Sequence, residues 1–312
     1  MAYVAGFQPK GEGYIKLNTN ENPYPPKVSL ENINLEKLKL YPDPESSTLT
    51  QAIADKYKVG VENVFCGNGS DEVLALIYET FFRGKVLNQP NISYGFYPVW
   101  SEFYNAKPNY IPLKDWKIDW SDYKEGNIII ANPNAPTGVG IKINSIPQGG
   151  IVVIDEAYLD FSDLPSAIEL TKKYDNLLVV RTFSKSYSLA GLRLGFAIGN
   201  EKLIAKLKES KDSFNSYPID MIAESLGTQA IKQDPLVEEV KKTRAWVETQ
   251  IDCLPSDANF VFWKIENAKA MYDYLMENKI VVRYWDKFPD RIRVSIGSQK
   301  EMEAFVKCVK AK

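Results

Sequence analysis

Short runs of consecutive apolar residues, separated by stretches with helical spacing, constrain the fold more than any other feature of this chain. They occur at residues 86–87, 127–131, 151–154, 177–180 and 195–198. Apolar residues follow one another in these runs instead of alternating with polar ones, a pattern typical of strands covered on both faces. Such strands between helical segments predict an α/β fold with a mostly parallel central sheet sandwiched by helices.

Beyond about residue 215 the pattern changes to that of a smaller α+β domain. We expect helices at 235–250, 268–278 and 299–311, and strands at 259–265, 280–285 and 291–296. The first 45 residues are rich in Asn, Pro and Glu, which predicts an irregular arm. The expected division is an N-terminal arm (1–40), a large domain (41–215) and a small C-terminal domain (216–312).

Composition excludes several classes of function. The formal net charge of −2 and the absence of a basic block indicate that neither nucleic acid nor a membrane surface is a partner. No apolar run approaches the ~20 residues that span a bilayer, and no secretory leader is evident. The 3 scattered cysteines are typical of reduced thiols, so we expect a cytoplasmic protein without a metal site.

The chain contains no histidine, which narrows the chemistry further. Its absence excludes Ser-His-Asp and Cys-His catalysis and the usual imidazole zinc sites. A general base must therefore be Lys, Asp, Glu, Tyr or Cys.

Residues 177–195, LLVVRTFSKSYSLAGLRLG, are the strongest candidate for a reactive site. Lys185 follows an apolar strand, where desolvation lowers the pKa of an amine and makes it nucleophilic toward carbonyls. Ser184 and Arg193 beside it suit a phosphate. An aldehyde that carries a phosphate is pyridoxal phosphate, so the stretch predicts a Schiff-base site. The alternative is a solvated lysine at a strand end.

A second candidate is the sequence VVIDEAYLDF at 152–161. Asp155 follows a buried strand, where a carboxylate is costly unless it is paired. The pyridinium N–H of pyridoxal phosphate is such a partner, and Tyr158, three residues later, could reach the phenolic oxygen of the ring. The alternative is an Asp that caps a turn.

Other motifs add weaker candidates. GNGSDE (67–72) could bind phosphate at a helix N-terminus, and Tyr94 offers an aromatic face, although core packing is the commoner role of a Tyr. NPNAPTG (132–138) is a rigid turn after a strand. Near the end of the chain, Arg293 could bind a substrate carboxylate, while we expect Arg291 to lie on the opposite face in solvent.

The order of these motifs resembles that of the fold-type I pyridoxal-phosphate-dependent aminotransferases, and most closely the histidinol-phosphate aminotransferase family. The resemblance covers essentially the whole chain. It rests on LNTNENPYPP, LYPDPES, GNGSDE, SYGFYPVW, NPNAPTG, DEAYLDF, RTFSKSYSLAGLRLGF, PSDANF and IVVRYW…RIRVSIG.

The resemblance implies a role for each matching residue. Lys185 holds the cofactor covalently and moves the substrate proton, Asp155 pairs with the pyridine nitrogen, and Arg293 binds the substrate α-carboxylate. Arg283, together with Tyr3 from the arm of the other subunit, contacts the substrate phosphate. The remaining cofactor contacts implied are Tyr94, Tyr158, Ser70, Asp71, Ser184, Arg193 and, from the partner subunit, Tyr41.

Two departures from the family pattern stand out. The family often has Asn before Pro-Thr-Gly, where this chain has Ala135, and Asn134 beside it is the remaining candidate for the contact to the cofactor. The stretch between Gly138 and Ile151 is too short for the usual crossover helix, so a simple loop is expected there.

The implied function is transamination between L-histidinol phosphate and 2-oxoglutarate, a step of histidine biosynthesis. The family also implies a homodimer with shared active sites, an arm that packs on the small domain and the partner, and small-molecule amino donors and oxo-acid acceptors. The alternatives are an aromatic amino acid aminotransferase, a threonine-phosphate decarboxylase and a non-catalytic protein with the same fold.

Overall fold

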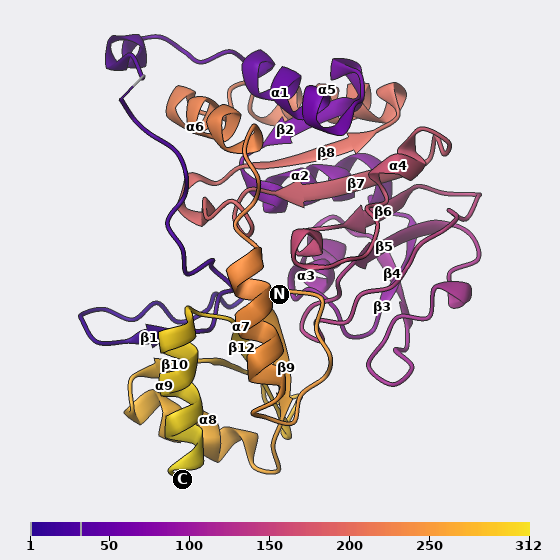
Figure 1. Ribbon diagram of the computed structural model, residues 1–312. Helices are drawn as coiled ribbons and strands as arrows, with labels where there is room; N and C mark the ends of the chain where they lie inside the picture. The colour runs from indigo at the N-terminus through magenta and orange to yellow at the C-terminus, as the bar shows by residue number, and fades with distance from the viewer. Residues whose placement is uncertain (1, 32) are drawn as a thin grey trace.

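The computed structural model describes residues 2–31 and 33–312, so positions 1 and 32 of the expected arm lie outside it. Its centre is a 7-stranded sheet in the order β2-β8-β7-β6-β5-β3-β4 (Figure 1). Strand β8 runs antiparallel to β2 and β7, whereas the other pairs of this sheet are parallel, which confirms the predicted α/β class. The strands are β2 (Val64–Gly67), β3 (Val86–Pro90), β4 (Lys107–Ile111), β5 (Asn127–Ala131), β6 (Val152–Asp155), β7 (Leu177–Thr182) and β8 (Gly195–Gly199).

The continuous apolar runs are explained by burial of both sheet faces. In β5, Ile128 and Ile130 join one core cluster and Ile129 joins the other, as expected for side chains that alternate along a strand. Helices α1 (Ser47–Tyr57), α4 (Ile168–Thr171) and α6 (Met221–Ile231) contribute to the first cluster. Helices α2 (Gly69–Ile77), α3 (Phe96–Phe103) and α5 (Glu201–Phe214) contribute to the second. Strands β2, β5, β6, β7 and β8 therefore pack against side chains on both faces, whereas the edge strand β4 is largely exposed.

The link between β5 and β6 contains no helix in the structure, as its short length predicts. An extended loop takes the place of the helix. Its side chains Ile141, Ile143 and Ile146 are buried in the first core cluster. The loop thus covers the sheet face with three isoleucines.

The C-terminal part of the chain forms a smaller unit, in orange and yellow in Figure 1. Its sheet has the order β11-β12-β9, with α7 (Glu238–Glu248), α8 (Ala268–Glu277) and α9 (Gln299–Lys310). A capping box between Ser298 and Glu301 fixes the start of α9. The predicted strand at 280–285 is interrupted. Its first part, β10 (Ile280–Val281), pairs with the arm, and its second part, β11 (Arg283–Tyr284), pairs with β12 (Arg291–Ser295), whose other neighbour is β9 (Phe260–Lys264).

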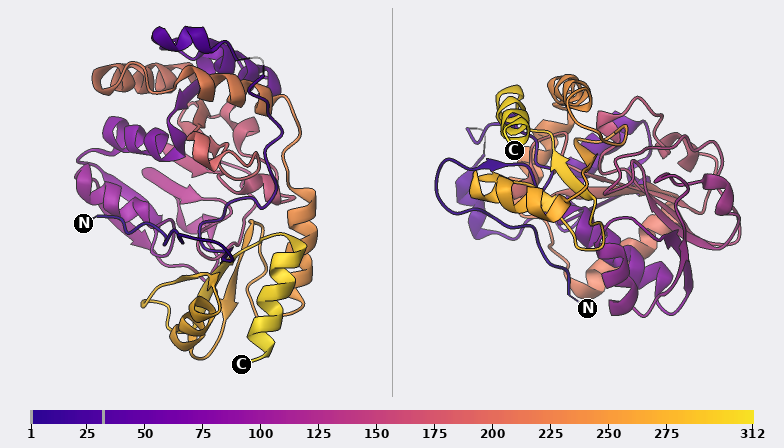
Figure 2. Two further views of the ribbon diagram at one scale, coloured as in Figure 1. Left: turned by 90° about the vertical axis from the view of Figure 1, so that its left-hand side faces the viewer. Right: turned by 90° about the horizontal axis from the view of Figure 1, so that it is seen from below.

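The N-terminal arm joins the two parts of the molecule. Its strand β1 (Ile15–Lys16) pairs in parallel with β10 of the C-terminal unit. Figure 2 shows the arm, in indigo, crossing the junction between the large sheet and the yellow C-terminal unit before it continues to α1. No helix in the described ranges is long and apolar enough to cross a membrane.

Strand β8 approaches the start of α2 so closely that only glycine fits at position 195. A Cβ added to Gly195 would lie 2.3 Å from the backbone nitrogen of Ser70 and 2.6 Å from the carbonyl carbon of Gly69. Because both atoms belong to the backbone, the clash cannot be relieved by a rotamer change. Gly195 thus sets the distance between the sheet and the first turn of α2.

We predict that Gly195→Ala lowers the free energy of unfolding by about 2 kcal/mol, because overpacking displaces backbone. Gly191→Ala is the matched control, since a Cβ there meets nothing within 4 Å. Urea unfolding of both variants measures the difference. Equal stabilities would show that the close approach carries no constraint.

Candidate active site

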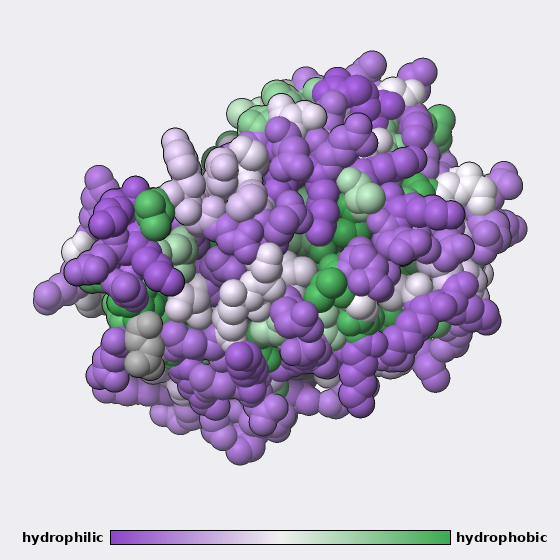
Figure 3. All heavy atoms as spheres, turned by 90° about the horizontal axis from the view of Figure 1, so that it is seen from above, coloured by the Kyte–Doolittle hydropathy of each residue, from purple (hydrophilic) through white to green (hydrophobic). Residues whose placement is uncertain are grey.

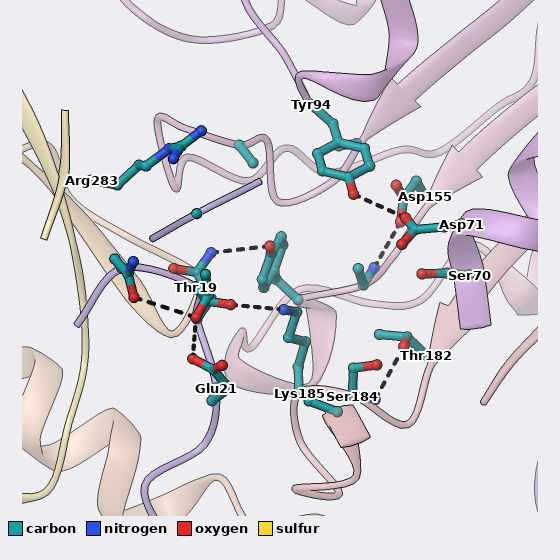
Figure 4. A pocket seen from close by; sticks show the side chains of 18 of the residues that line it. Thr19, Glu21, Ser70, Asp71, Tyr94, Asp155, Thr182, Ser184, Lys185 and Arg283 are labelled. Carbon is teal, nitrogen blue, oxygen red and sulfur yellow. Dashed lines mark hydrogen bonds between the residues drawn. The ribbon is translucent and has the colours of Figure 1, made fainter. Parts of the chain in front are cut away.

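A cavity of about 290 Å³ lies at the carboxyl edge of the parallel strands, where ligands bind in open α/β sheets (Figure 4). Ala131, Asp155 and Thr182 stand at the ends of β5, β6 and β7 and line it. The arm and the C-terminal unit close it from the other side. Of the residues named from the sequence, those that line it are Tyr3, Ser70, Asp71, Tyr94, Asp155, Tyr158, Ser184, Lys185, Arg193, Arg283 and Arg293.

Lys185 sits in the turn that follows β7, and its amine enters the cavity (Figure 4). The Nζ donates to the backbone oxygen of Thr19 at 3.2 Å and lies 5.7 Å from the centre of the Tyr158 ring. The side chain of Asn22 donates to the backbone oxygen of Lys185 at 3.2 Å. The arm therefore holds both ends of this residue.

Asp155 is a buried carboxylate at the end of β6. Burial raises the pKa of its carboxyl from 3.8 to about 6, against the hydrogen bonds it accepts. The Tyr97 hydroxyl donates to one oxygen at 3.0 Å and the Ala157 backbone N–H to the other at 3.1 Å. Neither donor is charged, so the site can receive a cationic N–H.

The first turn of α2 borders the cavity, and its backbone N–H groups and helix dipole favour negative charge. The Arg193 guanidinium donates to Asp71 at 3.2 Å and to the Ser184 hydroxyl at 3.4 Å. Gly69 has φ +81°, and a Cβ there would lie 2.7 Å from Arg193. The Tyr94 hydroxyl donates to Asp71 at 2.9 Å, which holds the Tyr94 ring over the cavity.

Two further arginines reach the cavity from the C-terminal sheet. Arg293 on β12 donates to the backbone oxygen of Asn18 at 2.7 Å, and its Nε has no partner among the residues described. Burial lowers the pKa of this guanidinium. Arg283 on β11 donates to the backbone oxygen of Val4 at 2.9 Å and lies 5.2 Å from the Trp285 ring centre. Guanidinium groups held by neutral carbonyls remain able to receive an anion.

The expectation that Arg291 lies on the opposite face in solvent is wrong. Residues two apart on a strand share a face, so Arg291 points to the same side as Arg293. It is buried, with its guanidinium 4.8 Å from the Trp116 ring centre and 5.7 Å from that of Phe262. Aromatic side chains from neighbouring segments thus enclose this cation.

Tyr3 lines the cavity of its own chain in the structure. The contact expected from the arm of the other subunit stays a prediction. The Tyr3 ring stacks on Phe96 with centroids 4.1 Å apart, and Arg283 holds the carbonyls of Val4 and Ala5 that follow it.

Asn134 and Tyr41 lie outside the cavity. The Asn134 side chain accepts from the Ser93 hydroxyl at 2.7 Å and donates to the backbone oxygen of Ile92 at 3.0 Å, which turns it away, whereas Ala135 lines the cavity. Tyr41 is exposed and stacks on Tyr217. Its reach into a partner subunit stays a prediction.

Sequence reasoning assigned no separate role to the segment from Asn18 to Glu21, although all four of its residues line the cavity. Asn18 and Asn20 are only 1% exposed, and Asn20 adopts a left-handed conformation with φ 57°. The one sequence signal is a run of polar residues between Leu17 and the prolines, with no helical or strand period.

The profile of the family described as aminotransferase class I and II matches residues 12–309. The chain belongs to this family. Among curated class I and II aminotransferase relatives, a histidinol-phosphate aminotransferase from Brachyspira hyodysenteriae is 47% identical, with 99% of this chain and 95% of that protein covered. One from Clostridium botulinum is 44% identical, with 99% and 94% covered. These similarities confirm the expected resemblance.

Solved aminotransferase structures share the fold. The histidinol-phosphate aminotransferase from Clostridium acetobutylicum matches with a TM-score of 0.83 and 25% identity, over 95% of this chain and 98% of that one. A histidinol-phosphate aminotransferase from Sinorhizobium meliloti, solved with pyridoxal-5′-phosphate, matches with a TM-score of 0.81 and 21% identity, over 95% and 91%.

The raised pKa of Asp155 predicts how the cofactor-free protein responds to pH. Because the folded pKa of about 6 lies above the ordinary 3.8, the contribution of Asp155 to stability is largest below pH 4 and is lost as the pH rises through 6. Asp155→Asn removes this loss, so its stability relative to the wild type should increase by about 2 kcal/mol between pH 4 and pH 8.

Urea unfolding at the two pH values tests this prediction. Asp55→Asn is the control, because Asp55 is exposed on α1. If the difference between Asp155→Asn and the wild type is the same at both pH values, the carboxyl of Asp155 is not destabilised by burial.

Proposed function

We propose that the protein is a pyridoxal-phosphate-dependent aminotransferase that interconverts L-histidinol phosphate and 2-oxoglutarate with imidazole-acetol phosphate and L-glutamate. One observation carries the chemistry: the amine of Lys185 and the buried carboxylate of Asp155 enter the same cavity. The substrate choice rests on the curated histidinol-phosphate aminotransferases that are 42–47% identical over nearly the whole chain. We place the enzyme in the cytoplasm.

The residues of the cavity fit pyridoxal phosphate. Asp155, whose pKa burial raises to about 6, gains a compensating cation from a pyridinium N–H. Arg193, Ser184, Ser70 and the first turn of α2 suit the phosphate. Tyr94 would cover the ring, and Tyr158 would meet its phenolic oxygen. When bound, the cofactor supplies an electron sink for negative charge that develops at the substrate carbon.

In this proposal Lys185 has two tasks. Its Nζ would hold the cofactor, and the same amine, once released, would take the proton from the substrate Cα. The Thr19 carbonyl, 3.2 Å from Nζ, holds the amine on the cavity side. General-base catalysis requires a group with this reach, and the chain has no histidine to compete for the role.

The arginines provide a basis for binding the substrates. Arg293 would form a bidentate pair with the α-carboxylate of glutamate, a group that L-histidinol phosphate lacks. Arg283, with Tyr3 beside it, would bind the substrate phosphate. The amino donor and the oxo-acid acceptor would occupy the site one after the other, so the same residues would bind both.

Exposed apolar side chains support the proposed homodimer. Leu35, Leu38, Leu40 and Tyr41 are 54–83% exposed on the segment that precedes α1. Figure 3 shows apolar side chains, in green, among the polar ones on this side of the molecule. In the proposed dimer this segment packs on the partner and brings Tyr41 to the cofactor phosphate of that subunit.

Trp285 favours a second candidate, an aromatic amino acid aminotransferase. Its ring centre lies 5.2 Å from the Arg283 guanidinium and 5.4 Å from that of Arg293. A ring could stack there in place of a phosphate.

We predict that Lys185→Ala lowers turnover by more than about 10³-fold, because the covalent and the proton-moving group are one amine. Borohydride treatment of the wild type with pyridoxal phosphate should attach the cofactor to the peptide that contains Lys185, as mass spectrometry would detect. The exposed Lys202→Ala variant should keep both properties. Wild-type protein that shows no visible absorption band with pyridoxal phosphate would refute the proposed function.

Substrate choice is tested by the half-reactions. Glutamate should bleach the visible band, and imidazole-acetol phosphate should restore it faster than phenylpyruvate. Arg283→Gln should raise KM for imidazole-acetol phosphate by about tenfold while the glutamate step changes less. A preference for phenylpyruvate would favour the aromatic enzyme, and release of CO₂ from threonine phosphate would favour the decarboxylase.

A further inference from the structure

Asn20 is a buried residue of the arm that touches the cavity without belonging to any strand or helix. It is 1% exposed and keeps a left-handed conformation, with φ 57°. Its side-chain Nδ2 donates to the Tyr158 hydroxyl at 3.1 Å, and its Oδ1 accepts from the Ser295 hydroxyl at 2.7 Å. Its backbone oxygen accepts from the side chain of Asn259 at 2.9 Å.

The hydrogen-bond network fixes the direction of the Asn20 amide. The Ser295 hydroxyl accepts from the backbone N–H of Asn20 at 2.9 Å, so its single hydrogen is free to be donated. Ser295 is 2% exposed, and a buried hydroxyl hydrogen needs an acceptor. Only the Oδ1 of Asn20 meets that need within this network, because a flipped amide would present two donors to the same oxygen. Nδ2 therefore faces Tyr158.

This direction determines what the Tyr158 hydroxyl can do. A phenol has one hydrogen to donate, and its oxygen here accepts from Asn20. Within the part of the chain that the structure describes, the hydroxyl makes no other hydrogen bond, and Tyr158 lines the cavity. Its hydrogen is thus available to an acceptor placed in the cavity.

The neighbouring wall offers no side-chain donor of this kind. Ala135 packs in one small cluster with Tyr158 and Phe260, and its methyl group has no hydrogen bond to give. The amide of Asn134 is turned to the backbone oxygen of Ile92 at 3.0 Å. At this edge of the cavity, Tyr158 is the side chain placed to donate.

We propose that Asn20, held by Ser295, is a positioning residue that fixes the Tyr158 hydroxyl as a hydrogen-bond donor to the cofactor's phenolic oxygen. The inference rests on the proposed function and adds a residue to it. A donor at that oxygen competes for the proton that the oxygen shares with the Lys185 nitrogen, and so lowers the pKa of that proton.

Other charges act on the same proton, and the experiment has to separate them. The Lys185 Nζ lies 5.7 Å from the centre of the Tyr158 ring. Burial in the same cavity lowers the pKa of Arg293 and raises the pKa of Tyr94. The titratable groups that line the cavity are Tyr3, Glu21, Asp71, Tyr94, Asp155, Tyr158, Lys185, Arg193, Arg283 and Arg293. A substitution that acts only through charge would not depend on the Tyr158 hydroxyl.

The test is a pH titration of the visible absorption band of the enzyme loaded with pyridoxal phosphate. Asn20→Asp replaces the donor by an acceptor, which turns the Tyr158 hydrogen away, and should raise the midpoint by about one pH unit. Ser295→Ala removes the hydroxyl that fixes the direction of the Asn20 amide. It adds no charge and changes the packing little, and it should raise the midpoint by less than Asn20→Asp does. Each variant is also made in a Tyr158→Phe background, where the shift of Ser295→Ala should vanish and that of Asn20→Asp should shrink to the part that its added charge causes.

The outcomes separate this inference from the proposed function. No visible band in the wild type would refute the function itself. A titrating wild-type band with unchanged midpoints in both variants would overturn the role of Asn20. A Ser295→Ala shift that persists in the Tyr158→Phe background, or an Asn20→Asp shift that keeps its full size there, would also overturn it, since the effect would then not depend on the Tyr158 hydroxyl. If Asn20→Asp does not fold, Ser295→Ala with its Tyr158→Phe partner decides.

Discussion

A buried ion cluster between β6 and β7 holds the two ends of the candidate site in register. Arg181 on β7 lies 3.1 Å from Glu156 and also pairs with Asp160, both of which follow β6. Asp160 accepts in turn from the hydroxyl of Ser186, the residue after Lys185. Breaking one partner of such a cluster leaves an unpaired buried charge, which is far more costly than a surface pair. The cluster therefore ties the Lys185 turn to the strand end that carries Asp155.

The contrast between paired and unpaired charges distinguishes framework from site. Arg181 is 5% exposed and has two carboxylate partners. Asp155 is equally buried but has only neutral donors, and Arg293 has a neutral acceptor. Burial raises the pKa of Asp155 and lowers the pKa of Arg293, so in each case it favours the uncharged form. A buried charged group without a charged partner destabilises the fold, and a bound ligand of opposite charge can offset that cost.

Much of the fold and the reactive edge of the sheet followed from the sequence. Strands buried on both faces are marked by continuous apolar runs, and a parallel sheet brings their carboxyl ends together. The sequence therefore predicts that Asp155 and Lys185 lie at the same edge of the sheet. Asn20 could not be found this way, because its partners Ser295 and Tyr158 are distant in the chain. The place of Tyr3 in the cavity of its own chain could not be found from the sequence for a similar reason: it depends on contacts of the arm with Phe96 and Arg283. Arg291 was misplaced although strand alternation alone gives its face.

The arm is the element that makes one site from two sheets. Three consecutive residues give the Asn18 carbonyl to Arg293, the Thr19 carbonyl to Lys185 and the Asn20 side-chain amide to Tyr158. The parallel pairing of β1 with β10 fixes the start of this segment on the C-terminal unit. The Arg293 guanidinium of one unit and the Lys185 amine of the other are thus held by neighbouring carbonyls of the arm, those of Asn18 and Thr19. In the proposed function, a carboxylate that displaced the Asn18 carbonyl from Arg293 would act on the peptide group next to the one that holds the amine.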